Sequence, residues 1–596
     1  MRRYTTARWK CVLQTDISRR RLSARAPVFL AAALLLSFLP RAAHAQSQVF
    51  PKWVARYDAA HSFDAPAAMA ADGRGGTYVT GTACTGATAS DPTVCADNEA
   101  LTIKYDSQGQ IVWKAWLSSR GHSATGQQIA VDAAGNAYVL FLMWQVRDQF
   151  NSLSSPEVAT AKYSASGARQ WINFIPSSSS VLYSPGQLAV SPDGGVYITL
   201  TSGAPNSVSY DAITIKYGTN GNFLWSRTAA PVPNDTNIPV ALQLDAAGNV
   251  YALVFSEFNS QIHESIIFRY DASGNLLHYF GGDKLGTIAA FRVDPQGDSY
   301  VAGGGSPHAP HGAEANVVAK FNPDGSVGWL HDFGLTSDNP QSSPFVDLAV
   351  DRAGNVFVAQ TLPGATPTNG GRDISVMKFD STGQVQWTTR YNGHADDSGF
   401  DKAVAVAVNS AGEAYVTGSS SGAAGGPYYE FATVKYDTKG NQLWVQRYAG
   451  PGPQGSSPPV ALVLSGPDVL VTGSSDGGST QLDWATIDYV QDAAQLSPTS
   501  LNFGDQPIGS QSAAQSITLT NTAEVPLTIF SIDVTGDFNL INNCPSVLAQ
   551  GATCSLGVTF SPSDLGPRSG TLTVRDDWAG SKTNPQTAQL TGAGTQ

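Results

Sequence analysis

The sequence predicts an all-β chain: an eight-bladed β-propeller closed by an N-terminal strand, followed by an Ig-like β-sandwich. Three observations carry this prediction: a recurring four-strand pattern, complementary half-patterns near the two ends of that repeat, and a change of texture near residue 495. The 596 residues include 59 Gly and 34 Pro but only 14% charged residues, which favours short strands joined by turns over helices. We expect a signal peptide at 1–45, the propeller at 46–494 and the sandwich at 495–596.

Each repeat begins with two strands, which we call A and B. Strand A is an apolar run that ends in Asp, as in Gln128-Ile-Ala-Val-Asp132. A Gly-containing turn follows, in which Asp can bond its own backbone and Gly can take a positive φ. Strand B starts with Tyr-Val or a close variant, at Tyr78, Tyr138, Tyr197, Tyr251, Tyr300, Phe357 and Tyr415.

Strand C ends in Lys-Tyr or a variant, and strand D carries a Trp or His marker. The aromatic residue that ends strand C precedes this marker by eight residues in all seven repeats in which strand D follows strand C, as in Tyr105 to Trp113 and Tyr436 to Trp444. Turn length fixes hairpin register, and a one-residue slip would move every side chain to the other face. Successive markers lie 51 to 58 residues apart, the spacing of a four-stranded propeller blade.

The two ends of the repeat region complement each other. Asp483-Trp-Ala-Thr-Ile-Asp-Tyr489 resembles strand C, but no strand D follows it. Trp53-Val-Ala-Arg-Tyr57 matches the strand-D segments Trp387-Thr-Thr-Arg-Tyr391 and Trp444-Val-Gln-Arg-Tyr448. The N-terminal strand should therefore complete the last blade, which removes unpaired sheet edges. Eight strands A indicate eight blades; seven is the alternative, because the last A–B turn, Ser465-Gly-Pro-Asp468, is one residue short.

The elements D-x-x-G-N-x-Y-V-T-G and A-T-x-K-Y-D-x-x-G resemble the bacterial β-propeller repeats called SBBP, over about residues 48–490. This resemblance implies an extracellular binding or scaffold module and names no site. From Leu496 the alternating strands, such as Gly570-Thr-Leu-Thr-Val574, resemble the Ig-like domains of the ASPM/SPD-2/Hydin type, found in exported bacterial proteins labelled choice-of-anchor D.

A basic stretch, the apolar run at 28–39 and Ala43-His44-Ala45 predict a signal peptide cleaved near Ala45, exported by the Sec or the twin-arginine route. The mature protein is then secreted, periplasmic or at the cell surface, without a transmembrane anchor. Removal of nine Lys/Arg and one Asp would leave 26 basic and 46 acidic residues, which argues against nucleic acid as a partner.

Four cysteines remain after cleavage, as two close pairs. Cys84 with Cys95, and Cys544 with Cys554, predict two local disulfides in an exported chain. Zinc is the alternative, but no C-x₂-C spacing or nearby His accompanies either pair.

One polar pattern exceeds what turns and core require: an acidic residue stands just before strand C in every repeat. Fold symmetry would place these residues as a ring at one end of the propeller, either as a ligand-binding rim or as structural partners of backbone N–H groups. The candidate ring comprises Glu99, Glu157, Asp211, Glu264, Glu314, Asp373, Glu430 and Asp483.

The sequence contains neither an H-E-x-x-H motif nor a P-loop, and we predict no catalytic or cofactor-binding residue. Calcium is a possible cofactor because of the Asp-rich A–B turns, although turn chemistry explains them, and His308 with His311 forms a weak metal candidate. Variable B–C segments at 83–98, 145–156, 304–313, 361–372 and 419–429 offer binding loops, with aromatic residues such as Phe141 and Trp144 nearby.

These features favour a non-catalytic exported protein that presents variable loops to an extracellular protein or carbohydrate ligand, with the sandwich as a spacer or docking domain. The alternative is an extracellular carbohydrate-active hydrolase or lyase with its site at the channel mouth, since its carboxylates could come from different blades.

Overall fold

In the computed structural model the described residues form β-strands and no helix. They are residues 49–596 except 60–63, 89–90, 118–121, 148–151, 154–155, 179, 205–206, 208, 230–235, 259–261, 283, 306–315, 334–344, 365–370, 394–398, 422–428, 454, 479–481, 492–493, 522–525, 550 and 577–584. The predicted signal peptide lies outside them.

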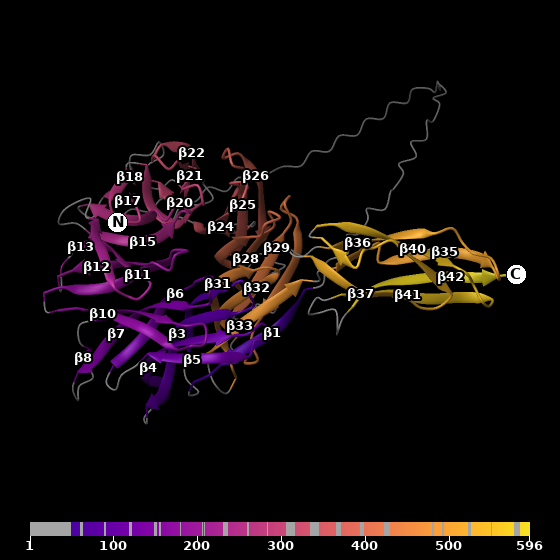
Figure 1. The fold of residues 1–596 in the computed structure, drawn as a ribbon, viewed down its shortest axis with the longest axis horizontal. Helices are drawn as coiled ribbons and strands as arrows, with labels where there is room; N and C mark the ends of the chain where they lie inside the picture. Colours follow the sequence, from indigo (N-terminus) through magenta and orange to yellow (C-terminus); the bar gives the residue numbers. More distant parts are fainter. Residues whose placement is uncertain are drawn as a thin grey trace, which may run out of the picture. The chain divides into compact units, whose positions relative to one another are not determined.

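Residues 49–491 form eight four-stranded units (Figure 1). Units 1 to 4 contain β2 (Ala65–Ala71), β3 (Thr77–Thr88), β4 (Asp91–Tyr105), β5 (Ile111–Leu117); β6 (His122–Val131), β7 (Ala137–Arg147), β9 (Glu157–Tyr163), β10 (Arg169–Pro176), with β8 (Ser152–Leu153) on β7; β11 (Leu182–Val190), β12 (Val196–Gly203), β13 (Tyr210–Tyr217), β14 (Phe223–Ala229); and β15 (Thr236–Leu244), β16 (Val250–Phe258), β17 (Ile262–Tyr270), β18 (Leu276–Gly282). Units 5 to 8 contain β19 (Leu285–Val293), β20 (Ser299–Gly305), β21 (Asn316–Phe321), β22 (Val327–Asp332); β23 (Phe345–Val350), β24 (Val356–Pro363), β25 (Arg372–Phe379), β26 (Val385–Tyr391); β27 (Lys402–Val408), β28 (Ala414–Ser421), β29 (Tyr429–Tyr436), β30 (Gln442–Tyr448); and β31 (Ser456–Ser465), β32 (Asp468–Asp476), β33 (Leu482–Gln491), β1 (Val49–Tyr57).

The four strands of each unit pair antiparallel and correspond to strands A to D of the repeat. Strand A of each unit contacts strand A of the next, and β31 of unit 8 contacts β2 of unit 1. The succession of units therefore returns to its start. The short turn after Ser465 does not remove the last unit, because β31 and β32 still pair from Ser456↔Ser475 to Ser465↔Asp468.

The N-terminal strand β1 pairs antiparallel with β33, which is the pairing predicted from the sequence. In unit 8 the charged residue of strand C is acidic instead of basic, and the base comes from β1. Asp488 stands where strand C of the other units carries Lys or Arg, and Lys52 supplies the base from β1. The Lys52 Nζ lies 3.1 Å from Asp488 Oδ2 and 3.0 Å from Asp468 Oδ1, and the Asp488 side chain is 2% exposed. An N-terminal cation thus neutralises a carboxylate buried in the last unit.

In several units, tryptophan and basic side chains donate hydrogen bonds to the C–D turn of the next unit. In unit 1, Trp113 Nε1 and Lys104 Nζ both donate to the carbonyl oxygen of Ala165, at 3.1 and 3.3 Å. Trp171 Nε1 donates in the same way to Thr219 O of unit 3 at 3.0 Å. The same turn approaches so closely that a Cβ on Gly221, at φ 82°, would lie 2.7 Å from the Trp171 ring. The turn glycine therefore serves packing between units as well as turn conformation.

The strand-C bases lie over aromatic rings of strand B, which are their cross-strand neighbours. Lys104 Nζ is 4.8 Å from the centre of the Tyr78 ring, and Tyr78 pairs with Lys104 in the sheet. The equivalent pairs are Lys162 over Tyr138, Lys216 over Tyr197, Arg269 over Tyr251, Lys320 over Tyr300, Lys378 over Phe357 and Lys435 over Tyr415. These bases are therefore part of the scaffold, as cation–π partners of buried rings.

The C-terminal residues form two packed sheets, as expected for an Ig-like sandwich. The first has the order β34-β36-β40-β38 and the second β35-β42-β41-β37-β39. The strands are β34 (Ala494–Ser497), β35 (Ser500–Pro507), β36 (Gln515–Asn521), β37 (Leu527–Val534), β38 (Phe538–Asn542), β39 (Val547–Leu548), β40 (Thr553–Phe560), β41 (Gly566–Asp576) and β42 (Gln586–Thr595). The core between the sheets includes Leu519, Leu556, Phe560, Val574 and Leu590.

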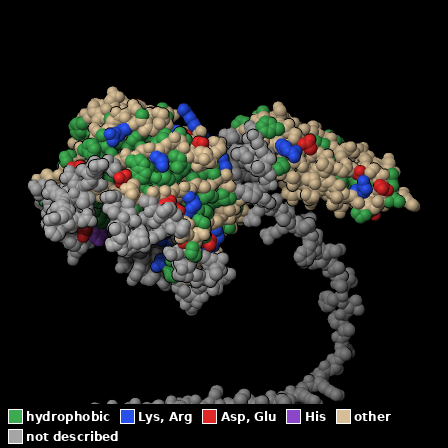
Figure 2. All heavy atoms as spheres, turned by 90° about the horizontal axis from the view of Figure 1, so that it is seen from below, with side chains coloured by type: hydrophobic (Ala, Val, Ile, Leu, Met, Phe, Trp, Pro, Cys, Tyr) green, Lys and Arg blue, Asp and Glu red, His purple; other side chains and the backbone are tan. Residues whose placement is uncertain are grey.

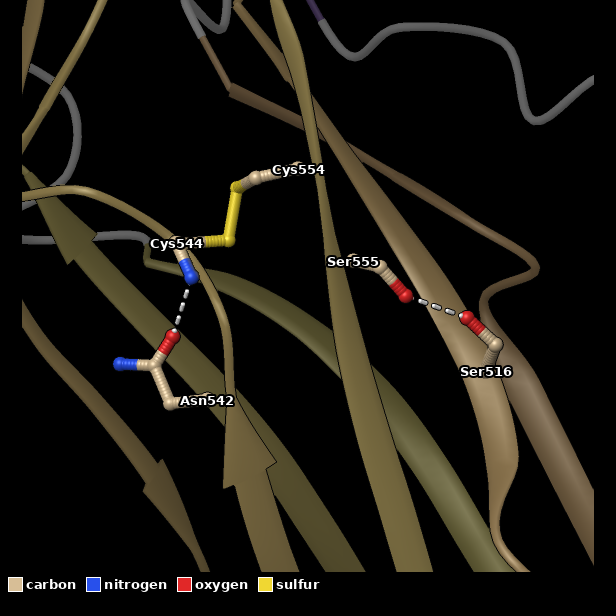
Figure 3. The surroundings of a disulfide bond; sticks show 5 residues. All are labelled: Ser516, Asn542, Cys544, Cys554 and Ser555. Carbon is tan, nitrogen blue, oxygen red and sulfur yellow. Dashed lines mark hydrogen bonds between the residues drawn. A yellow bond between two sulfur atoms is a disulfide. The ribbon is translucent and has the colours of Figure 1, made fainter.

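The Cys544–Cys554 disulfide is present and ties the start of β40 to the segment before β39 (Figure 3). The two Cα atoms are 5.1 Å apart, and Asn542 Oδ1 accepts a hydrogen bond from the Cys544 backbone N–H at 2.9 Å. Cys84 is also disulfide-bonded, whereas the side chain of its predicted partner, Cys95, lies outside the described residues.

Candidate functional site

The structure places seven of the eight predicted acidic residues at equivalent positions on strand C, and Glu314 lies outside the described residues. Each of the seven stands five residues before the strand-C base, or before Asp488 in unit 8. They are Glu99 on β4, Glu157 on β9, Asp211 on β13, Glu264 on β17, Asp373 on β25, Glu430 on β29 and Asp483 on β33.

In units 6 to 8 these carboxylates pair with an arginine of strand D. Asp373 Oδ2 lies 3.4 Å from Arg390, Glu430 Oε2 lies 2.6 Å from Arg447, and Asp483 Oδ2 lies 2.8 Å from Arg56. In each unit the arginine lies opposite the residue two after the acid, at Ser375↔Arg390, Ala432↔Arg447 and Arg56↔Ala485. The pairs are therefore diagonal cross-strand contacts on one face of the sheet.

Two of these arginines also bridge to the preceding unit. Arg447 donates to the Tyr391 hydroxyl at 3.0 Å and to Gly393 O at 3.2 Å. Arg56 donates to the Tyr448 hydroxyl at 2.9 Å. The carboxylates of units 7 and 8 are thus bound into hydrogen-bonded links between units. Their partners are guanidinium groups, whereas the structural interpretation of the sequence expected backbone N–H groups.

Sequence reasoning missed these arginine partners, although a signal was available. The Trp-x-x-Arg-Tyr motif occurs only in the strand-D segments at 53–57, 387–391 and 444–448, and these are the three units that contain the pairs. The motif identified these segments as strands D, and its Arg also marks the units in which the acid of strand C forms an ion pair.

A cavity of about 940 Å³ opens among units 5 to 8, at the end where the A–B turns lie. It is lined by strand-A residues such as Arg292, Val350, Val406 and Leu462, and by the A–B turns that start at Asp294 and Asp351. Because antiparallel strands alternate in direction, the A–B turns lie at the end of each unit opposite to the B–C segments. The cavity therefore lies at the other end from the loops that the sequence singled out.

One ion pair crosses strands A in this region. Arg292 on β19 lies 2.8 Å from Asp347 on β23, and the other oxygen of Asp347 accepts the Val406 backbone N–H at 3.0 Å. Burial raises the pKa of Asp347, and the Arg292 charge opposes this shift. Arg292 and Asp347 are the only charged residues among the five positions that precede the first residue of each A–B turn. Charged residues in a stretch otherwise rich in Ala and Val were the signal in the sequence that pointed to this region.

The carboxylates that line the cavity are already engaged. Asp294 accepts hydrogen bonds from the backbone of Gln296 and Asp298 and from the Tyr300 hydroxyl, each at 3.0 Å. Asp298 pairs with Lys320 at 2.6 Å, and Asp351 accepts from the Asn355 amide at 2.7 Å. The exposed Arg352 has no hydrogen bond or ion pair within the described part of the chain. The cavity therefore offers a ligand the guanidinium group of Arg352 as a hydrogen-bond donor.

The A–B turns use their Asp side chains for turn hydrogen bonds. Asp132 Oδ1 accepts the backbone N–H groups of Ala134 and Asn136, and Oδ2 accepts from the Asn136 amide and the Tyr138 hydroxyl. Over the described residues, no group of three or more His, Cys, Asp or Glu is arranged to hold a metal ion. His308 and His311 lie outside those residues.

Two predictions about the B–C segments are wrong: that Phe141 is available for binding, and that residues 83–98 form a loop. Phe141 is 1% exposed and belongs to the core, because it pairs with Gly126 and Ala159 inside the sheet. Residues 83–98 were expected as a loop, but β3 and β4 extend through most of them as a hairpin. Most residues of the other four B–C segments lie outside the described residues.

Charged side chains on the face drawn in Figure 2 are scattered, with Lys and Arg near Asp and Glu and hydrophobic side chains between them. The described residues contain no helix that is long and apolar enough to cross a membrane.

Residues 493–583 match the family described as "Abnormal spindle-like microcephaly-assoc'd, ASPM-SPD-2-Hydin". The ASH/PapD-like domain of human CEP192 is similar to this region; it has 13% identity and a TM-score of 0.14, covering 17% of this chain and 86% of that domain. The family match confirms the predicted resemblance of the C-terminal domain, while the SBBP resemblance stays a prediction.

Two solved enzymes are similar to larger parts of the chain. Polysaccharide lyase Uly1 has 10% identity and a TM-score of 0.36, over 61% of this chain and 89% of the lyase. Hadza microbial sialidase Hz136 has 10% identity and a TM-score of 0.29, over 54% of this chain and 71% of the sialidase. No curated protein matches the chain.

Proposed function

We propose that the mature chain is an exported, non-catalytic binding protein, in which residues 46–494 form an eight-bladed β-propeller closed by the N-terminal strand. The ligand is an extracellular protein or carbohydrate, and the Ig-like domain at 495–596 is a spacer or docking domain. Export after cleavage near Ala45 agrees with the Cys544–Cys554 disulfide, since disulfides persist in oxidising compartments.

The observation that carries this proposal is the state of the carboxylates around the cavity. A general acid or base must be able to reach substrate and exchange a proton with it. Asp294, Asp298 and Asp351 instead accept hydrogen bonds or pair with Lys320. Arg352 remains as a donor at the surface of the cavity, whereas Arg292 is paired with Asp347. This set suits the recognition of carboxylate, hydroxyl or carbonyl oxygens without bond cleavage.

The hydrolase or lyase alternative requires carboxylates that are free to act. Asp373, Glu430 and Asp483 are held by arginines, which favours a structural role for these three residues. The B–C segments remain the second proposed contact surface, because variable loops on a rigid scaffold commonly carry binding sites.

A binding and turnover survey of residues 46–596 tests the proposal. We expect saturable binding to one class of extracellular polysaccharide or surface protein, with no release of reducing ends or unsaturated products. An Arg352→Ala variant should weaken a ligand held in the cavity at least fivefold, whereas Arg74→Ala, at an exposed arginine outside the cavity and outside the B–C segments, should not. Product release from a bound polysaccharide would contradict the proposal, as would a survey in which nothing binds.

A further inference from the structure

Unit 4 departs from the repeat in strand D. Its strand β18 carries His278 where most units carry Trp, and Gly281 follows three residues later. The register Ile266↔Gly281 corresponds to Ser375↔Arg390 and Ala432↔Arg447 in units 6 and 7. Gly281 therefore stands where units 6 to 8 place the arginine that pairs with the acid of strand C.

The acid of strand C is nevertheless retained in unit 4. Glu264 lies two residues before Ile266, as Asp373 lies two residues before Ser375. Within the described part of the chain, no side chain or backbone group forms a hydrogen bond or ion pair with the Glu264 carboxylate. Its Oε2 would lie 3.8 Å from a Cβ built on Gly282. The carboxylate therefore lies beside Gly282, the residue that follows the vacant arginine position.

A cavity of about 360 Å³ is lined by Glu264, Tyr279, Phe280, Gly281, Gly282 and Lys284 among others. Gly281 has φ 107°, and a Cβ there would lie 2.6 Å from Ser265 O, so in this backbone the arginine position of unit 4 cannot carry a side chain. The Tyr279 side chain is 61% exposed and packs against Phe268, with ring centres 6.0 Å apart. The cavity therefore combines a carboxylate with exposed aromatic surface.

We propose that this cavity binds the guanidinium group of an arginine side chain from a partner polypeptide. Three units of the same chain fill the equivalent position with arginine against the same acid, so the site is the repeat's own carboxylate–guanidinium contact with one half missing. A guanidinium is planar, presents a fork of donors to a carboxylate and stacks on aromatic rings, which an ammonium does less well. This inference rests on the proposed binding function but concerns a different cavity.

Lys284 also lines the cavity and already has an interaction partner. Its charge opposes the entry of a second cation. Replacement of Lys284 by Ala should therefore strengthen guanidinium binding, which a merely structural cavity would not show.

The test uses the mature chain with three peptides, Gly-Arg-Gly, Gly-Lys-Gly and Gly-citrulline-Gly, each with blocked ends, titrated by calorimetry at low salt. We expect the arginine peptide to bind at least tenfold more tightly than the citrulline peptide and more tightly than the lysine peptide. Glu264→Gln should lower arginine-peptide affinity at least tenfold. Glu157→Gln is the matched control, because Phe174 occupies the arginine position in unit 2 and Glu157 should not contribute.

Equal affinities for the arginine and citrulline peptides would overturn the proposal, as would no binding at 10 mM peptide or full affinity in Glu264→Gln. Melting temperatures identify variants that fail to fold, and Tyr279→Ala then provides the second variant expected to lose affinity. Arginine-peptide binding by a chain that binds no natural polysaccharide or surface protein would separate this site from the proposed function.

Discussion

The ion pair between Lys52 and Asp488 gives the sharpest test of how the two ends of the repeat region are joined. Lys52→Met removes the base that lies 3.1 Å from a carboxylate whose side chain is 2% exposed. Removal of one partner from a buried ion pair costs about 3–5 kcal/mol. The loss of Lys52 also leaves Asp468 without its ion pair, but this costs less free energy because the Asp468 side chain is 14% exposed.

Protonation of Asp488 limits this cost and makes it depend on pH. Burial and the nearby Asp468 charge raise the pKa of Asp488, and Lys52 opposes the shift. Because the native pKa lies above the unfolded value, the contribution of Asp488 is present at low pH and is lost as pH rises through the native pKa. Without Lys52 this pKa rises further, so the loss in Lys52→Met should be larger at pH 9 than at pH 6.

The assay is urea unfolding of residues 46–596 at pH 6 and pH 9, followed by tryptophan fluorescence. The control is the double variant Lys52→Met/Asp488→Met, which replaces the pair by apolar side chains and should unfold within about 2 kcal/mol of the wild type. If Lys52→Met unfolds with the wild type at both pH values, the buried pair does not hold the N-terminal strand.

Two further predictions concern the scaffold. Gly221→Ala should destabilise by about 2 kcal/mol more than Gly248→Ala in thermal unfolding, because both glycines have positive φ but only Gly221 meets a Trp171 ring; equal losses would contradict the packing role. Burial raises the pKa of Asp64 to about 6, against opposing hydrogen bonds from the backbone N–H groups of Cys84 and Ala59, so its stabilising effect is full below pH 4 and falls as pH rises through 6. The wild type should therefore melt at a higher temperature than Asp64→Asn at pH 4, and this difference in melting temperature should become smaller by pH 7. A difference that stays constant between the two pH values would refute the prediction.

The order of strands could be predicted from the sequence because the repeat is strict. The eight-residue spacing from Tyr105 to Trp113 recurs along the chain and fixes hairpin register. The shared Trp-x-x-Arg-Tyr of β1, β26 and β30 identified the N-terminal segment as a strand D. Local spacing and turn chemistry were sufficient for these features.

The candidate sites were harder to predict because they depend on diagonal and inter-unit contacts. The arginine partners of Glu430 and Asp483 come from strand D, 17 and 427 positions away in sequence. The cavity at Arg292 is formed by four units, and turn chemistry alone accounted for Asp294 and Asp351 in the sequence. The vacancy beside Glu264 is visible only when the register shows which residue replaces the arginine.

The most direct test of the central claim, that one ring of eight units is shared between the two ends of the repeat region, compares two truncations of the mature chain. Deletion of 46–57 removes β1 and leaves β33 paired only with β32, whereas deletion of 495–596 removes most of the C-terminal domain and leaves all eight units. The account predicts a large fall in the melting temperature of the repeat region for the first deletion and a small change for the second. Equal melting temperatures for the two truncations would contradict it.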